Sequence, residues 1–292
     1  MCCHHSPGPG RRAFTRFLAA GAGLTVLAAC TPDSAAEQPP SPSPAGSSAS
    51  PSAETAASAS PTRNAPPSAT PSAASATASA PAPPSAASAL PKQFSLTDPA
   101  SPWLVVNKHR PLVPADYAPA DLVQPRVLLA VSGEAALLNS TTAAAAEKLF
   151  AAAARDGVAT TLASGYRSYG TQTATYNGYV SSRGQADADT ASARPGYSEH
   201  QTGWSFDIGD GGGSCGFQPC FADQPAAVWA KANAHRYGFV VRYPLTLHPV
   251  TGYYYEPWHL RYIGVEAASD MKKSGISTLE EYFGLEAAPG YS

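Results

Sequence analysis

The stretch SEHQTGWSFDIGD, residues 198–210, has the pattern that decides how this chain folds. Within it, Trp204, Phe206 and Ile208 alternate with smaller or polar residues, as in a β-strand with one buried face. Successive side chains of a strand point to opposite faces, so Asp207 is expected to lie away from these apolar side chains. The stretch therefore predicts a strand with an apolar side and a carboxylate on its other side.

The same stretch carries His200, seven residues before Asp207. A fully extended chain would separate the two by about 23 Å, so they can meet only if the chain turns. Gly203 is the residue at which we expect that turn. Imidazole nitrogen and carboxylate oxygen are common zinc ligands. The pair alone leaves two interpretations open: two ligands of a metal, or a polar turn followed by a strand-end acid.

A second motif, YYEPWHLRYIG at residues 254–264, adds Glu256 and His259. A third ligand and a nearby carboxylate base are what a zinc hydrolase needs. Pro257 opposes a helix here, and on a flat strand positions 256 and 259 face opposite sides. A bend or bulge near Pro257 is therefore required to aim both side chains at one metal. Without it, they are a surface glutamate and a histidine flanked by aromatic residues.

A third motif, SGYRS at residues 164–168, lies where a short strand is expected to pass into a helix. Arg167 would project from the end of the sheet at that junction. Its guanidinium group offers a fixed fork of donors to a carboxylate or to a developing oxyanion. A structural ion pair is the alternative role for this arginine.

Around these motifs, helical and strand patterns are mixed within residues 92–286, enough chain for one domain with a single core. Strands that hairpins can join, set among helices, favour an α+β fold with a central antiparallel sheet flanked by helices. Ser140 and Gly157 are expected to bound the first helix, and Ser168 and Gly184 the second. The predicted helices span 141–157, 169–184, 224–238, 265–275 and 277–284, and the predicted strands span 158–165, 203–208, 239–244 and 252–264.

The first 29 residues are typical of an export signal. Arg11, Arg12 and Arg16 precede an apolar run over 17–29, which is shorter than the about 20 residues needed to span a bilayer. The run ends in LAAC, which resembles a bacterial lipobox, so Cys30 is expected to carry a diacylglycerol after cleavage. RRAFTRFL resembles a twin-arginine signal, with an ordinary Sec signal as the alternative.

Residues 34–91 consist almost entirely of alanine, serine, proline and threonine. This composition cannot bury a core and its prolines forbid long helices, so residues 30–91 are predicted to form a disordered linker. Such a linker would span about 40 Å as a coil and roughly 180 Å as polyproline II, enough for an anchored domain to search the cell-wall layer. Residues 287–292 are predicted to be a tail. The formal net charge of -2 gives no large basic surface for nucleic acid.

The predicted processing divides the 5 cysteines. Cleavage before Cys30 would remove Cys2 and Cys3, and lipidation would occupy Cys30 itself. Cys215 and Cys220 remain, and outside the cytoplasmic membrane a pair with this spacing favours a disulfide that closes a small loop. A zinc site on these thiolates is the alternative, but two thiolates alone do not complete one.

Four motifs occur in order along the chain: SGYRSYGTQ at 164–172, ARPGYSEHQTGWSFDIG at 193–209, YGFVVRYP at 237–244 and YYEPWHLRYIG at 254–264. Together they resemble the VanY-type D-alanyl-D-alanine carboxypeptidases, zinc peptidases that share a fold with the signalling domain of hedgehog proteins and with lysostaphin-like endopeptidases. VNKHRPLVPADYAPADL at 106–122 matches the usual opening of that family, and the resemblance covers residues 103–264.

The resemblance implies a zinc site and a role for each of several side chains. It implies the zinc ligands His200, Asp207 and His259, a general base at Glu256, an oxyanion-stabilising arginine at Arg167, and substrate contacts at Ser198 and Gln172. Trp204 and Ser205 stand where the family usually has leucine and alanine. This departure concerns the shape of the pocket rather than the metal ligands.

The protein implied by the resemblance is a zinc-dependent D-alanyl-D-alanine carboxypeptidase. We expect a monomer, anchored to the outer side of the bacterial cell membrane as a lipoprotein. Its substrates would be peptidoglycan stem peptides that end in D-Ala-D-Ala, from which it would remove the terminal D-alanine. A related dipeptidase or endopeptidase activity is an alternative. A catalytically silent, zinc-containing wall-binding module is another, which the presence of Glu256 and Arg167 disfavours.

Overall fold

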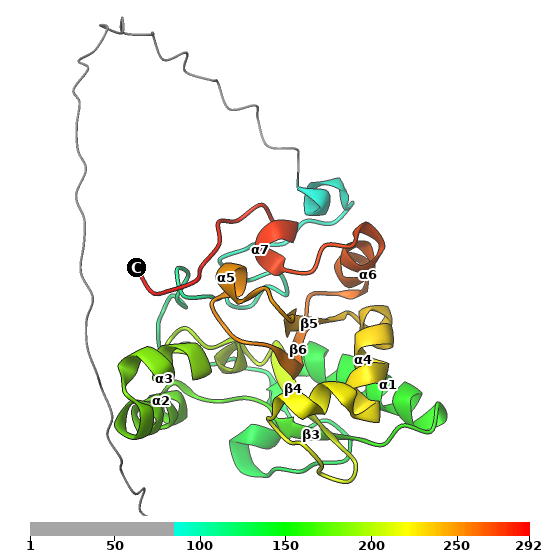
Figure 1. Ribbon diagram of the computed structural model, residues 1–292. Coiled ribbons are helices and arrows are strands. Elements are labelled where there is room, and N and C mark those ends of the chain that lie inside the picture. Colours follow the sequence, from blue (N-terminus) through cyan, green and yellow to red (C-terminus); the bar gives the residue numbers. More distant parts are fainter. Residues whose placement is uncertain (1–84) are drawn as a thin grey trace, which may run out of the picture. The chain divides into compact units, whose positions relative to one another are not determined.

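The computed structural model describes residues 85–292, so the predicted signal, the lipid attachment at Cys30 and the linker up to residue 84 lie outside the described residues. The centre of the described part is a four-stranded antiparallel sheet with the strand order β3-β4-β6-β5 (Figure 1). Its strands are β3 (Thr160–Ser164), β4 (Ser205–Asp210), β5 (Phe239–Tyr243) and β6 (Glu256–Tyr262). Together with the helices around it, this sheet confirms the predicted α+β fold.

Most helices lie where the sequence predicts them, but two short ones do not follow from any periodic pattern. These two are α3, which has no apolar stripe, and α5, a single turn that contains a proline. The helices are α1 (Ser140–Arg155), α2 (Tyr169–Arg183), α3 (Gln185–Ala191), α4 (Pro225–Asn233), α5 (His248–Thr251), α6 (Val265–Ser274) and α7 (Leu279–Tyr282). The smaller elements are the strands β1 (Leu122–Val123) and β2 (Leu138–Asn139) and the 3-10 turns η1 (Ala86–Ala89), η2 (Gly133–Ala136), η3 (Glu199–Thr202), η4 (Pro219–Asp223) and η5 (Ala234–Tyr237).

The cap of α1 differs from the prediction by one residue. The side chain of Asn139, not Ser140, accepts hydrogen bonds from the backbone N–H groups of Thr141 and Thr142. The Ser140 hydroxyl instead donates to the carboxylate of Asp121, at 2.6 Å. Asparagine is as good an N-cap as serine, and with the cap at Asn139 the helix begins one residue earlier, at Ser140.

Strand β4 has the two faces that its alternating pattern predicts. Phe206 and Ile208 are buried in the main core together with Leu149 of α1 and Trp229 of α4. Asp207 lies on the opposite face of the strand, where the sheet meets η3 rather than the two large helices. The packed apolar face therefore fixes the position from which the Asp207 carboxylate projects.

Both ends of the folded part extend beyond their predicted limits. Ala87, which the composition assigns to the linker, is 4% exposed and packs with Trp103 and Tyr282 in a second core cluster. At the other end Ala288 is fully buried, and its backbone N–H donates to the carbonyl of Val250 at 2.8 Å. An isolated alanine can fill a small apolar site without any periodic signal, so composition alone could not place these boundaries.

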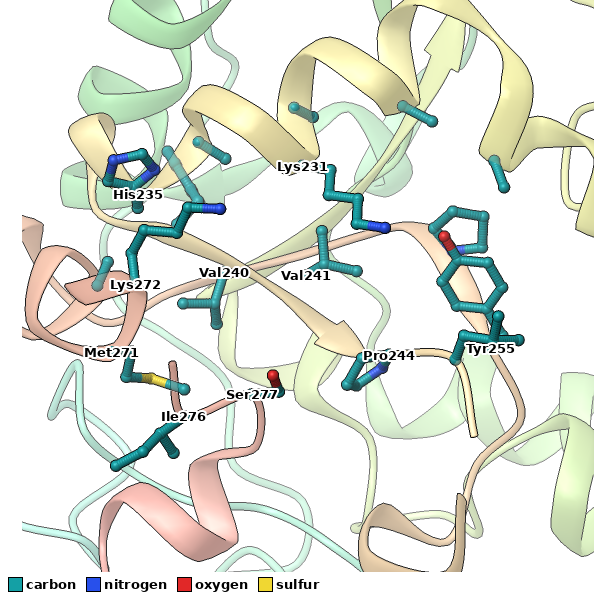
Figure 2. A pocket seen from close by; sticks show the side chains of 18 residues that line it. Lys231, His235, Val240, Val241, Pro244, Tyr255, Met271, Lys272, Ile276 and Ser277 are labelled. Carbon is teal, nitrogen blue, oxygen red and sulfur yellow. The ribbon is translucent and has the colours of Figure 1, made fainter. Parts of the chain in front are cut away.

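A mostly apolar cavity of about 240 Å³ lies between α4, β5 and α6 (Figure 2). Val240, Val241 and Met271 line it, with Lys231 and Lys272 among its polar residues. None of the predicted metal ligands lines this cavity, so it is separate from the candidate site described below. Among the helices of residues 85–292, none combines the length and the apolar character needed to cross a bilayer.

Candidate metal centre and active site

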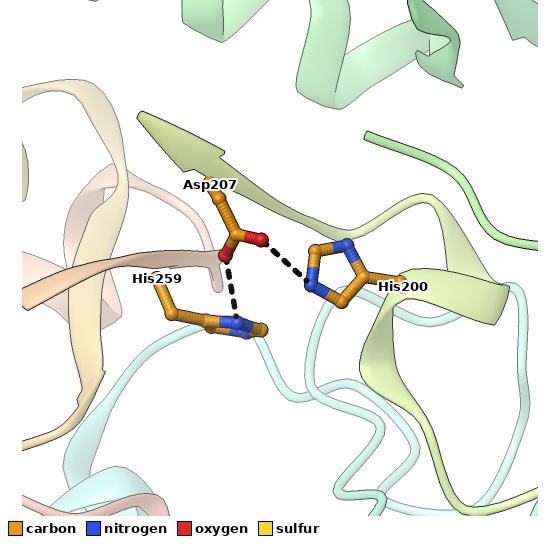
Figure 3. Close-up of side chains that lie close together, drawn as sticks. All are labelled: His200, Asp207 and His259. Atoms are coloured by element: carbon orange, nitrogen blue, oxygen red, sulfur yellow. Dashed lines mark ion pairs between the residues drawn. The ribbon is translucent and has the colours of Figure 1, made fainter. Parts of the chain in front are cut away.

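Three predicted ligands converge at the centre of the sheet (Figure 3). His200 comes from η3, Asp207 from β4 and His259 from β6, where Asp207 and His259 are directly paired across the two strands. Nε2 of His200 lies 3.4 Å from Oδ2 of Asp207, and Nδ1 of His259 lies 3.2 Å from Oδ1. One donor atom from each residue lies within 4.8 Å of the others, a spacing that one metal ion can bridge.

A left-handed turn at Gly203 brings His200 back beside Asp207, at the place where the sequence predicts it. Gly203 has a φ of 67°, a conformation that side chains with a Cβ rarely adopt. It also lies close to another segment, because a Cβ at this position would be 2.7 Å from the backbone nitrogen of Asn139. The turn and the start of α1 are therefore packed backbone to backbone, and the position of His200 depends on both.

A bulge in β6 places Glu256 on the same side as His259. Val241 pairs with Leu260 and Tyr243 pairs with Glu256, so residues 257–259 of β6 face a single residue of β5. This is the irregularity that the spacing of the two side chains requires, and it lies at Pro257. As a result Oε2 of Glu256 is 3.6 Å from Nδ1 of His259.

The donor atoms of this cluster fit a divalent metal. Nδ1 of His200 lies 2.7 Å from the carbonyl oxygen of Gly165, which can only accept, so Nε2 of His200 is free to bind a metal. Oδ1 of Asp207 is buried and has no well-aligned hydrogen bond within residues 85–292. Two imidazoles and one carboxylate, with one position left for water or substrate, are the donor set of catalytic zinc sites.

The acidity of the two histidines differs because their surroundings differ. Burial lowers the pKa of His200. For His259, burial is outweighed by the carboxylates of Asp207 and Glu199, which raise its pKa to about 9. Without a metal, the cluster therefore holds a proton that a bound cation would displace.

Glu256 is more accessible than the ligands beside it. Its side chain is 22% exposed, whereas those of His200, Asp207 and His259 are 7% exposed or less. Burial raises the pKa of Glu256 to about 7, although His259 opposes the shift. A carboxylate that can be reached from solvent and titrates near neutral pH is suited to accept a proton from water and to return it later.

Arg167 and Gln172 are hydrogen-bonded to each other close to His200. Nη1 of Arg167 donates to Oε1 of Gln172 at 2.9 Å, and the backbone N–H of Arg167 donates to the carbonyl of His200. Gln172 is fully buried, and its amide nitrogen donates to Ser192 and to the carbonyl of Ala193. Gln172 is therefore a buried partner that holds Arg167, and the substrate contact expected of it from the sequence stays a prediction.

The remaining predicted positions are Ser198 and the cysteine pair Cys215 and Cys220. Ser198 is 4% exposed and directly precedes η3, two residues before His200. Cys215 and Cys220 are joined by a disulfide in the segment that follows β4. The disulfide closes a small loop, and Cys215 packs against the main core rather than against the metal ligands.

Sequence reasoning missed a group of buried charges behind the metal centre. Glu199 accepts a hydrogen bond from Nε of Arg242 at 2.8 Å, and the other end of Arg242 donates to Glu280 at 2.7 and 3.0 Å. Arg261 is also fully buried, with Nη1 3.6 Å from Glu199. The available signal was an arginine within each of two otherwise apolar strands, FVVRYP and HLRYIG.

Three comparisons place these features among known proteins. Residues 135–265 match the family described as VanY, D-alanyl-D-alanine carboxypeptidase. The Bacillus subtilis (strain 168) protein "Putative carboxypeptidase YodJ" is 37% identical over 191 residues, which cover 65% of this chain and 69% of that protein. The structure of the LdcB LD-carboxypeptidase, solved to explain peptidoglycan recognition, is 38% identical with a TM-score of 0.60, covering 64% of this chain and 87% of that one. A vancomycin resistance D,D-pentapeptidase VanY, solved as a mutant with Zn(II), is 32% identical with a TM-score of 0.50, covering 61% of this chain and 97% of that one.

Proposed function

This chain belongs to the VanY family of carboxypeptidases and is a metallopeptidase, and on that basis we propose that it is a zinc-dependent D,D-carboxypeptidase. Its proposed reaction is the hydrolysis of the last peptide bond in peptidoglycan stem peptides that end in D-Ala-D-Ala, with release of D-alanine. The observation that carries the proposal is the convergence of the partly exposed Glu256 with the buried side chains of His200, Asp207 and His259, near Arg167.

His200, Asp207 and His259 would hold the zinc ion through Nε2, a carboxylate oxygen and Nδ1. A zinc ion in such a site polarises a scissile carbonyl and lowers the pKa of water to about 7. The zinc-bound relative in the same family supports the choice of this metal. The burial of all three ligands supports a site whose geometry is set by the fold rather than by the ion.

Glu256 would act as the general base and then as the general acid. Its carboxylate would take a proton from the attacking water and later give that proton to the departing amine of D-alanine. Arg167 would donate from its guanidinium group to the oxygen of the scissile carbonyl as negative charge develops there. Gln172 would hold Arg167 in place, and Ser198 would contact the terminal part of the substrate.

The decisive experiment is mass spectrometry of the products from a defined muropeptide pentapeptide, with and without a chelator. Chelator-sensitive release of free D-alanine supports the proposal. Release of a D-Ala-D-Ala dipeptide, or of larger fragments, would instead assign a dipeptidase or an endopeptidase. Binding of the peptide in zinc-containing buffer with no cleavage would assign a silent wall-binding module.

A second candidate activity is L,D-carboxypeptidase, which acts one residue earlier in the stem peptide. The LdcB structure favours it, because that LD-carboxypeptidase has 38% identity and a TM-score of 0.60. A muropeptide tetrapeptide that ends in a single D-alanine separates the two activities. Cleavage of the tetrapeptide and not of the pentapeptide would replace the first proposal by this one.

We also propose that the domain works outside the cytoplasm, anchored by a lipid on Cys30. The LAAC motif at residues 27–30 and the proposed wall substrate both support this location. Cys30→Ala should move the protein from the membrane fraction to the soluble fraction after export. Retention of this variant in the membrane fraction would argue against a lipid anchor at this residue.

A further inference from the structure

A buried carboxylate that has no part in the proposed chemistry contacts the metal cluster from behind. Glu199 is 2% exposed, and Oε2 of its side chain lies 3.3 Å from Nε2 of His259. A carboxylate oxygen can only accept, so this contact places the proton of the neutral imidazole on Nε2. Nδ1 of His259, which faces Asp207 at 3.2 Å, is then left with its lone pair toward the metal position.

The two oxygens of Glu199 have separate partners. Oε1 accepts from Nε of Arg242 at 2.8 Å and faces Nη1 of Arg261 at 3.6 Å, while Oε2 faces His259. Arg242 is itself held at its other end by Glu280, at 2.7 and 3.0 Å. Glu199 therefore cannot rotate freely, because turning its carboxylate would break a buried charge-assisted hydrogen bond.

We propose that Glu199 is a positioning residue of the metal centre: it fixes the orientation of His259, and Arg242 fixes the orientation of Glu199. The inference rests on the proposed function only in treating His259 as a metal ligand. Carboxylates that accept from the outer nitrogen of a ligating histidine raise the basicity of the ligand and set its orientation. The network extends this effect to α7, which contributes Glu280.

Glu199→Gln is a sharp test because Arg242 decides which way the new amide points. The carbonyl oxygen of the glutamine must face Arg242, because the guanidinium group and the amide NH₂ group can both only donate. The NH₂ group is then left facing Nε2 of His259. To accept from it, His259 must carry its proton on Nδ1, the atom that would bind the metal.

The measurement is the dissociation constant for Zn²⁺, obtained by competition with a chromogenic chelator on the full folded domain. Glu199→Gln should bind Zn²⁺ about 10- to 100-fold more weakly than the natural protein. Glu280→Gln is the matched control, because it removes a buried carboxylate from the same Arg242 but touches no metal ligand. The control should lose stability with a clearly smaller change in Zn²⁺ affinity. An unchanged affinity in Glu199→Gln, or an equal loss in both variants, would overturn the assignment.

A measurement on the natural protein covers the case in which Glu199→Gln does not fold. In the zinc-loaded protein, ¹⁵N NMR should show His259 ligated through Nδ1 with a proton on Nε2. Ligation through Nε2 would overturn the proposal. Neither experiment uses a peptide substrate, so a protein that binds zinc as described but releases no D-alanine would refute the proposed function and leave the role of Glu199 standing.

Discussion

Oε2 of Glu256 lies 3.6 Å from Nδ1 of His259, although two residues three positions apart on a regular strand point to opposite faces of the sheet. The bulge at residues 257–259 of β6 accounts for this, since these residues face only Arg242 of β5. The sheet register, rather than a helical turn, thus brings a carboxylate next to a histidine ligand. The pair is therefore one geometric unit whose two members can be tested separately.

Replacing Glu256 by alanine should remove turnover and leave the metal in place. The side chain is not one of the three clustered donors, but it is the accessible carboxylate beside them. Loss of a general base costs about 10²- to 10⁴-fold in rate. Elemental analysis and D-alanine release check the two halves of the prediction, with the exposed Glu266→Ala as a control. A Glu256→Ala enzyme that keeps most of its activity would refute the assigned role.

Replacing His200 by alanine should remove the metal itself. His200 supplies one of three donors, and its ring is held by Gly165 so that Nε2 points into the cluster. Elemental analysis after extensive dialysis should find almost no zinc in His200→Ala. His248→Ala, which alters an exposed histidine in α5, should retain it. Equal zinc content in the two variants would contradict the ligand assignment.

The parts of the fold that sequence could predict are those governed by local rules. The faces of β4 follow from residue alternation, and Ser168 and Gly184 bound α2 as capping preferences predict. Gly203 was identifiable because the chain had to turn within a short stretch. Each of these inferences uses neighbours only a few residues apart.

The parts that could not be predicted depend on partners far along the chain. Asn139 rather than Ser140 caps α1, and both side chains bond to Asp121, 18 and 19 residues away in the sequence. Glu199 meets His259 only once η3 and β6 are packed together, 60 residues apart in sequence. No periodicity or composition encodes such pairings, so the carboxylate behind the metal became visible only in three dimensions.

Replacing Gly203 by alanine should destabilise the domain. The residue has a φ of 67°, and a Cβ there would meet the backbone nitrogen of Asn139 at 2.7 Å, where nothing flexible can yield. Backbone strain of this kind costs about 1–3 kcal/mol. Gly178→Ala is the matched control: it lies within α2 with open space around it, and alanine should stabilise the helix by about 0.5–1 kcal/mol. If urea unfolding shows that both substitutions change the free energy of unfolding in the same direction, this account is ruled out.

Replacing Arg167 by lysine should slow the reaction while the zinc content stays the same. Lysine keeps the charge but loses the planar fork that bonds Gln172 and would face the scissile carbonyl. Loss of one donor to an oxyanion costs about 10²- to 10³-fold in kcat. Arg183→Lys, an exposed change in the last turn of α2, should leave kcat unchanged. If Arg167→Lys has the kcat of the natural protein, the guanidinium group has no role in the reaction.

The ion pair between Glu280 and Arg242 should make part of the stability of the domain sensitive to acid. Burial alone would raise the pKa of Glu280, but the charge and hydrogen bonds of Arg242 outweigh it and hold the pKa below its ordinary value of 4.5. A group whose pKa is lower in the folded state binds protons more readily when unfolded. Its contribution is therefore fully present above about pH 4.5 and is lost as the pH falls through the lowered folded value.

The measurement is the free energy of unfolding in urea at neutral pH and at successively lower pH, for the natural domain and for Glu280→Gln. The natural domain should be more stable than the variant at neutral pH, and the difference should shrink as the pH falls below 4.5, because Glu280 becomes protonated and resembles glutamine. Glu266→Gln, an exposed change in α6, should follow the natural domain at every pH. A constant difference between Glu280→Gln and the natural domain across this range would show that the pKa of Glu280 is the same in the folded and unfolded states, and the linkage would not exist.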